Sequence, residues 1–115
     1  MMQRNQPISQ VEVEVELIRL NDMLESETEA FEMLAVDAAK KEATYKSNWA
    51  KEYLSAKGSI KEREAWADYK LAEQSYDYKI AEALLKSKRE KLSSLRTSID
   101  ALRTLSANVR MMVSP

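Results

Sequence analysis

The 115-residue sequence has no cysteine, no histidine, one glycine and two prolines. Without cysteine or histidine it has no thiol or imidazole nucleophile, no disulfide and no Cys/His zinc site. A single glycine, Gly58, disfavours the glycine-rich phosphate loops of Rossmann and P-loop proteins. So few turn-forming residues also disfavour a β-sandwich or barrel. The composition therefore predicts an all-α fold, and it makes an enzyme or a cofactor-binding protein a poor expectation.

The sequence also lacks long apolar segments. It has no run of 18 apolar residues, so we expect no membrane-spanning helix. The first seven residues contain no apolar stretch of signal-peptide length. With the absence of cysteine, this fits a reducing, intracellular location, which we take to be cytoplasmic. We expect residues 1–8 to be disordered.

Charge is abundant but unevenly distributed. Charged residues make up 32% of the chain, and the net charge is −1. By segment, the net charge is −7 for residues 1–39, +2 for residues 40–79 and +4 for residues 80–115. This asymmetry is consistent with polyanion binding by the basic part, with head-to-tail self-association, or with incidental surface charge. The acidic part is either a solvated helix face or a docking surface for a basic partner.

Three Ser-x-x-Glu motifs, beginning at Ser9, Ser26 and Ser59, have the spacing of a helix-capping box. Gly58 suits a helix end because it adopts left-handed backbone angles without a Cβ clash. We therefore predict a single helical domain over residues 9–115, with helices at about residues 10–24, 27–56 and 60–112. Alternating valines in residues 11–15 also fit a strand, but an isolated strand would have nothing to pair with.

Apolar residues in the third predicted helix recur at alternating spacings of three and four, a coiled-coil pattern. We expect a helical hairpin that turns at Gly58. The helix over residues 27–56 would pair with the first half of the helix over residues 60–112. The second half would project and oligomerise with other subunits. The residues predicted to oligomerise are Leu92, Leu95, Ile99, Leu102, Leu105 and Val109.

Two groups of side chains are candidates for function. Arg89, Arg96, Arg103 and Arg110 are seven residues apart and share one helix stripe, which fits either a phosphate track or the flank of a coiled coil. Around the turn, aromatic and basic residues are interleaved, which fits a hairpin core or a groove for single-stranded nucleic acid. The candidate nucleic-acid-binding residues are Lys46, Lys51, Lys57, Lys61 and Arg63. The aromatic residues are Tyr45, Trp49, Tyr53, Trp66, Tyr69 and Tyr76.

Residues 40–112 resemble the UvsY-like recombination mediator proteins of bacteriophages. The segments that carry the resemblance are Tyr45–Trp49, Ser55–Gly58, Lys61–Glu64, Ile99–Thr104 and Asn108–Met112. The resemblance implies a ring-like homo-oligomer that binds single-stranded DNA without sequence preference. It also implies contacts with a RecA-like recombinase and a single-strand-binding protein in a phage-infected bacterial cell. The DNA-binding residues of the family map here to Lys46, Lys51 and Lys57.

The alternative function is that of a structural or adaptor coiled-coil protein, such as a phage scaffold or assembly chaperone, without nucleic-acid binding. The two functions differ in what they require of the basic residues near Gly58. A DNA-binding protein needs them to face solvent together, whereas an adaptor can pair them with carboxylates.

Overall fold

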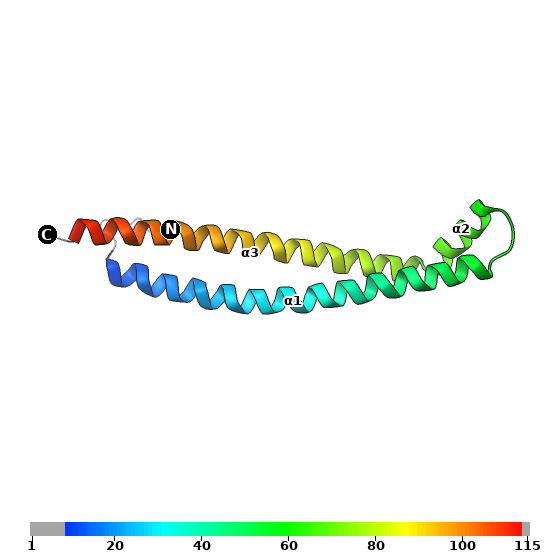
Figure 1. Ribbon diagram of the computed structural model, residues 1–115, viewed down its shortest axis with the longest axis horizontal. Coiled ribbons are helices and arrows are strands. Elements are labelled where there is room, and N and C mark those ends of the chain that lie inside the picture. Colours follow the sequence, from blue (N-terminus) through cyan, green and yellow to red (C-terminus); the bar gives the residue numbers. More distant parts are fainter. Residues whose placement is uncertain (1–8, 114–115) are drawn as a thin grey trace. The chain divides into compact units, whose positions relative to one another are not determined.

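A computed structural model describes residues 9–113, which form three helices (Figure 1). They are α1 (Gln10–Ser55), α2 (Ile60–Lys70) and α3 (Ala72–Val113). The predicted all-α class is confirmed. The chain divides into two compact units, and the single domain that we expected over residues 9–115 stays a prediction. Unit 1 holds the described residues up to Glu29 and from Glu90 onward, and unit 2 holds residues 30–89. The expected disorder of residues 1–8 lies outside the described residues.

Two of the three predicted helix starts are confirmed by their caps. The Ser9 hydroxyl accepts a hydrogen bond from the Glu12 backbone N–H, and the Ser59 hydroxyl accepts one from the Glu62 N–H, both at 3.2 Å. The Ser59 hydroxyl also donates to the Glu62 carboxylate at 3.1 Å. Each Ser thus satisfies a backbone N–H group that has no partner within the first helical turn.

The third predicted start, at Ser26, was wrong. The helices expected at residues 10–24 and 27–56 form one continuous helix, α1, because no glycine or proline interrupts the backbone between them. The Thr28 hydroxyl donates to the Leu24 carbonyl at 2.7 Å, which is a bond typical of a helix interior. A Ser-x-x-Glu spacing within an uninterrupted helical sequence is therefore not a start signal by itself.

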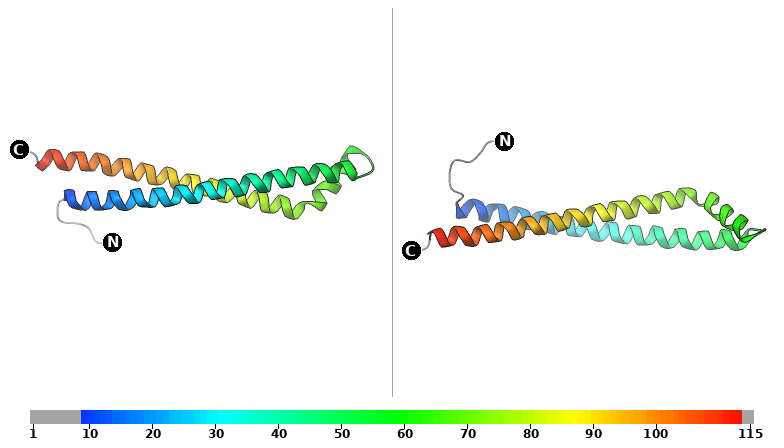
Figure 2. Two further views of the ribbon diagram at one scale, coloured as in Figure 1. Left: turned by 60° about the horizontal axis from the view of Figure 1, so that its bottom comes forward. Right: turned by 90° about the horizontal axis from the view of Figure 1, so that it is seen from above.

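The helix expected over residues 60–112 is interrupted at Leu71, where α2 ends and α3 begins. Leu71 has φ −109° and ψ 18°, although the sequence around it has no glycine or proline. Tertiary packing within unit 2 accounts for the break. Ala67 and Leu71 are buried, with exposed fractions of 0% and 7%. Side-chain hydrogen bonds also hold α2 beside the last turns of α1 (Figure 2).

Unit 1 pairs the first part of α1 with the last part of α3. Its core cluster consists of Leu20, Leu95 and Ile99. Leu92 and Val109 are also buried, and Leu102 and Leu105 are half-buried. The residues that we expected to meet other subunits thus belong to a seam that α1 of the same chain fills. Within unit 1 the three-four pattern of α3 faces α1 of the same chain, and the contact of these residues with other subunits stays a prediction.

Polar residues at two positions interrupt the apolar packing of unit 1. The Gln10 side-chain amide donates to the hydroxyl of the buried Ser106 at 3.0 Å. Lys91 forms a 3.1 Å ion pair with Glu27, whose side chain is only 17% exposed. Partners of this kind favour one register of two paired helices, since any shift would leave polar groups without partners. None of the helices within residues 9–113 is long and apolar enough to cross a bilayer.

Unit 2 contains the chain reversal. Gly58 has φ +115°, a backbone conformation that other residues rarely adopt, and it links α1 to α2. The rest of α1 pairs with α2 and with the beginning of α3, as the predicted hairpin requires. Tyr45 stacks on Tyr78 with ring centroids 5.7 Å apart, and the Asn48 amide donates to Gln74 at 3.1 Å.

Candidate nucleic-acid interface

The basic residues near Gly58 fall into two classes. Lys46 pairs with Glu42 at 2.6 Å on the same face of α1, and this hydrogen bond raises the pKa of Lys46. Lys51, Lys57 and Lys61 are exposed and form no ion pair within the described part of the chain. The three unpaired ammonium groups are therefore available to a phosphate backbone without first losing a carboxylate partner.

Arg63 is placed differently from these lysines. It is half-buried, and its guanidinium carbon lies 6.0 Å from the centre of the Tyr53 ring. Its Nε atom is buried without a hydrogen-bond partner among the described residues. The guanidinium therefore packs as a cation over an aromatic face. Of the five predicted nucleic-acid-binding residues, Arg63 is half-buried in unit 2 and the four lysines are exposed.

Three of the six aromatic side chains near the turn, those of Tyr45, Trp49 and Tyr53, are half-buried in the hairpin. Trp49 stacks on Tyr53 with centroids 5.4 Å apart, and its indole N–H donates to Asp68 at 2.9 Å. The Trp66 indole N–H of α2 donates in turn to Glu52 of α1 at 2.9 Å. Each tryptophan thus binds a carboxylate of the facing helix. These carboxylates hold α2 on α1.

A hydrogen bond also perturbs one of the stacked tyrosines. Tyr78 forms a side-chain hydrogen bond with Glu82, which raises the pKa of Tyr78 to about 12. Burial and the nearby negative charges act in the same direction, because each disfavours a phenolate. Tyr78 therefore stays a neutral hydrogen-bond donor at physiological pH.

Two tyrosines do not pack into the hairpin. Tyr69 is 76% exposed and Tyr76 is 66% exposed. The ring of Tyr69 is tilted against that of Trp66, with centroids 6.2 Å apart, and the Lys70 ammonium lies 5.4 Å above the Trp66 ring. Exposed rings beside cations are the features that stack unpaired bases. Sequence reasoning grouped these two tyrosines with the other aromatic residues near the turn.

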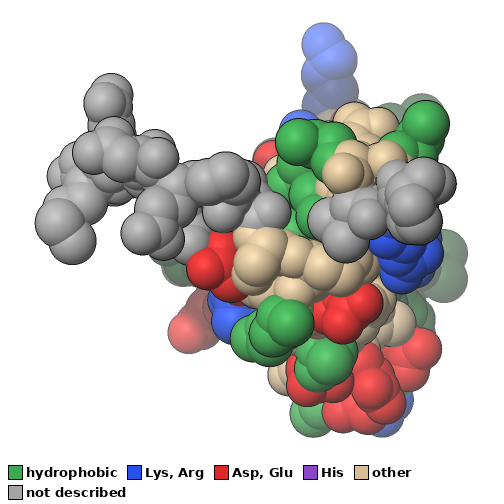
Figure 3. Space-filling model, turned by 90° about the vertical axis from the view of Figure 1, so that its left-hand side faces the viewer, with side chains coloured by type: hydrophobic (Ala, Val, Ile, Leu, Met, Phe, Trp, Pro, Cys, Tyr) green, Lys and Arg blue, Asp and Glu red, His purple; other side chains and the backbone are tan. Residues whose placement is uncertain are grey.

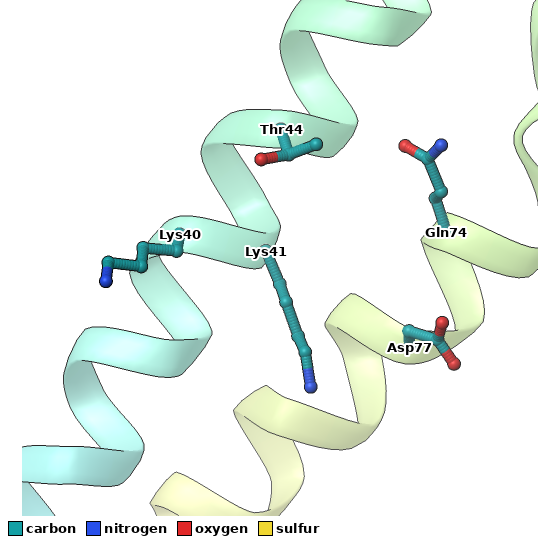
Figure 4. A pocket seen from close by; sticks show the side chains of 5 residues that line it. All are labelled: Lys40, Lys41, Thr44, Gln74 and Asp77. Carbon is teal, nitrogen blue, oxygen red and sulfur yellow. The ribbon is translucent and has the colours of Figure 1, made fainter.

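Two of the surface pockets in unit 2 adjoin basic residues. One, about 400 Å³ in volume, adjoins the turn and is lined by Glu52, Ser55, Ala56, Lys57, Glu62 and Trp66. The other, about 190 Å³, lies between α1 and α3 and is lined by Lys40, Lys41, Thr44, Gln74 and Asp77 (Figure 4).

In the second pocket, Lys41 extends toward α3 and Lys40 points away from it (Figure 4). Lys41 also pairs with Asp37 at 3.1 Å. Carboxylates disfavour an anion in both pockets, Asp77 in this one and Glu52 and Glu62 in the one beside the turn, so the exposed lysines outside the pockets are the better candidates for binding phosphates. Within residues 9–113 no cluster of three or more acidic side chains could hold a metal ion.

The four arginines spaced by seven residues form an arginine ladder along α3: Arg89, Arg96, Arg103 and Arg110. The Arg89 guanidinium lies 5.7 Å from the Phe31 ring centre in unit 2. In unit 1, Arg103 approaches Asp100 at 3.6 Å, whereas Arg96 and Arg110 are exposed and form no ion pair with a described residue. These positions fit the interpretation of the ladder as the flank of a helix pair. Two of its four cations remain available for a further partner.

Comparison of the chain with protein-family models, with curated proteins and with solved structures gave no match.

Proposed function

We propose that this chain is a recombination mediator of the UvsY-like kind, which binds single-stranded DNA as a homo-oligomer and has no catalytic role. The observation that carries the proposal is the surface near Gly58. There Lys51, Lys57 and Lys61 are exposed and unpaired, and the next helices present Tyr69 and Tyr76 to solvent. Lysines contact the phosphates and exposed rings stack on the bases, and neither contact reads sequence.

The proposed mechanism depends on linked weak sites. One such surface has few cations and several nearby carboxylates, so its affinity for DNA is low. In an oligomer the second and later contacts become intramolecular, and the assembly binds avidly. The oligomer then holds the strand while a RecA-like recombinase displaces the single-strand-binding protein. The proposed setting is the cytoplasm of a phage-infected bacterium.

The experiment is a fluorescence-anisotropy titration of a labelled oligo-dT strand at low and physiological salt. We expect salt-sensitive binding that is stronger than binding to a duplex. Substituting Lys51, Lys57 and Lys61 together by alanine should weaken binding and reduce the slope of log K against log salt by about 2, since single strands release about 0.7 counterion per contact.

A matched pair of single variants tests the site. Lys51→Ala removes an unpaired cation, and Lys46→Ala removes a paired cation five residues away on the same helix. We expect the larger loss from Lys51→Ala, because Lys46 already interacts with Glu42. Equal losses would contradict the assignment of the site to the unpaired lysines. Absence of binding at low salt would contradict the proposed function.

The adaptor function remains the second candidate, and a different observation favours it. Along the outside of α3, Tyr76, Ile80 and Leu84 are spaced by four residues and are 66%, 41% and 53% exposed. An exposed apolar stripe is a common site of helix–helix docking. A protein that binds no oligo-dT but retains a helical partner through this stripe would be an adaptor.

A further inference from the structure

The turn between α1 and α2 carries exposed aliphatic side chains that the proposed DNA site does not use. Leu54 lies in the last turn of α1 and Ile60 begins α2, and they are 76% and 66% exposed. The two side chains flank residues 56–59, which connect the helices. Aliphatic groups neither pair with phosphates nor stack on bases, so a bound DNA strand would leave both of them in water.

The charge next to these two side chains is positive. Residues 53–61 contain two lysines, Lys57 and Lys61, and no acidic residue. Lys51 is three residues before Leu54 and therefore lies near the same face of α1. All three lysines are exposed and form no ion pair with a described residue. An apolar pair is thus surrounded by cations that are free to meet an anionic surface.

The two carboxylates beside this segment already have partners within the turn. Glu52 accepts a hydrogen bond from the Trp66 indole N–H at 2.9 Å, and Glu62 accepts one from the Ser59 hydroxyl at 3.1 Å. With both carboxylates and three lysines counted, residues 51–62 keep a net charge of +1. The carboxylates therefore reduce the positive charge of the turn without reversing it.

Amphipathic aromatic side chains follow on α2. Trp66 is 43% exposed and Tyr69 is 76% exposed. The Lys70 ammonium lies 5.4 Å from the centre of the Trp66 ring. Tryptophan and tyrosine concentrate where water meets lipid, because each has an apolar ring with a polar group on it, and lysine reaches from there to the headgroups. The turn and α2 together have the residue types of a surface that binds at a membrane interface.

Exposed aliphatic side chains in unit 1 have the opposite surroundings. Val11 and Val15 are 68% and 60% exposed, and residues 11–16 contain three glutamates. In the end-on view, hydrophobic side chains lie on the outside of the near end with acidic side chains beside them (Figure 3). An anionic surface would repel this region, whereas it would attract the turn around Gly58.

We propose that the turn between α1 and α2 binds the surface of a bilayer that contains anionic lipids. Leu54 and Ile60 insert below the headgroups, and Lys51, Lys57 and Lys61 contact the lipid phosphates. Apolar burial and electrostatic attraction to anionic lipids add to each other in such binding, so neither has to be strong alone. This function goes beyond the proposed one, and because it uses the same lysines, a turn that is bound to lipid does not hold DNA.

Vesicle co-sedimentation of the full chain tests the proposal without DNA. The probes are vesicles of phosphatidylcholine alone and vesicles of phosphatidylcholine with an equal part of phosphatidylglycerol. We expect binding to the second kind only. Leu54→Ser with Ile60→Ser should lower that binding about tenfold or more, because two aliphatic side chains no longer leave water. Each of Lys51, Lys57 and Lys61 replaced by alanine should lower it about fivefold.

Val11→Ser with Val15→Ser is the matched control, because it removes aliphatic groups of similar exposure from the acidic region of unit 1. It should leave vesicle binding unchanged, and circular dichroism checks that each variant is folded. Absence of binding to the anionic vesicles at low salt would overturn the proposal. So would unchanged binding of the Leu54 and Ile60 variant, since the lysines would then attract lipid only as they attract any polyanion. Vesicle binding without binding of oligo-dT would support this inference and contradict the DNA-binding function.

Discussion

Ile99 provides the sharpest test of which helix fills the α3 seam. Its side chain is 2% exposed and packs in the cluster with Leu20 and Leu95. Ile99→Ala removes three carbon atoms, which is about 2.4 kcal/mol of transfer free energy at about 0.8 kcal/mol for each. The cavity left behind adds to this, so we expect a loss of about 3 kcal/mol, within the range observed for such substitutions.

The measurement is urea and thermal unfolding followed by circular dichroism. A loss of about 3 kcal/mol should lower Tm by roughly 12 °C or more in a chain of this length. The difference between the variant and the wild type should be the same at about 1 µM and about 100 µM protein, because a partner in the same chain has no concentration dependence. Ile60→Ala is the control, since it deletes the same atoms from a side chain that is 66% exposed.

Two results would refute this reasoning. A destabilisation that grows on dilution would mean that the seam is filled by another subunit, as the sequence pattern first suggested. A loss below about 1 kcal/mol, similar to that expected for Ile60→Ala, would mean that Ile99 lies in no core at all.

Three further predictions concern the turn, the polar pair and the stacked tyrosine. Gly58→Ala should destabilise the protein by about 1–3 kcal/mol in urea unfolding, because alanine is strained at φ +115°; an unchanged midpoint would mean that the turn has another conformation. Ser106→Ala should cost about 1–2 kcal/mol by leaving one N–H of the Gln10 amide without its acceptor, while the other still donates to Glu14, and Gln10→Leu in the same chain should recover most of that loss. Tyr78 should ionise only near pH 12 in an ultraviolet absorbance titration, and Tyr78→Phe should remove that late phase. Because the folded-state pKa is raised from 10.0, the stabilisation from the Glu82 hydrogen bond is complete below pH 10 and is lost as the pH rises through about 12.

Local chemistry predicted several features of this protein correctly. The caps at Ser9 and Ser59 depend on a hydroxyl and the N–H group three residues later, and both partners lie within one turn of sequence. The reversal at Gly58 depends on one residue without a Cβ atom. The apolar repeat of α3 likewise predicted which of its side chains are buried, because helical geometry alone puts them on one face.

The sequence was less informative where the partner of a pattern mattered. The repeat that buries Leu92, Leu95 and Ile99 is the same whether the facing helix belongs to this chain or to another. Ser26 has the spacing of a cap, but the helix continues through it. Tyr69 and Trp49 look equivalent in the sequence, yet only Trp49 reaches a carboxylate on the facing helix.

By itself, then, the sequence determined the helical class, the site of the reversal and the buried face of α3, because these follow from backbone geometry and near neighbours. Only the tertiary structure decided that α1 covers that face and that the helix breaks at Leu71. It also decided which cations near the turn remain unpaired. Each of these depends on which side chains, distant in the sequence, lie within hydrogen-bond or van der Waals distance, and a one-dimensional pattern does not contain those distances.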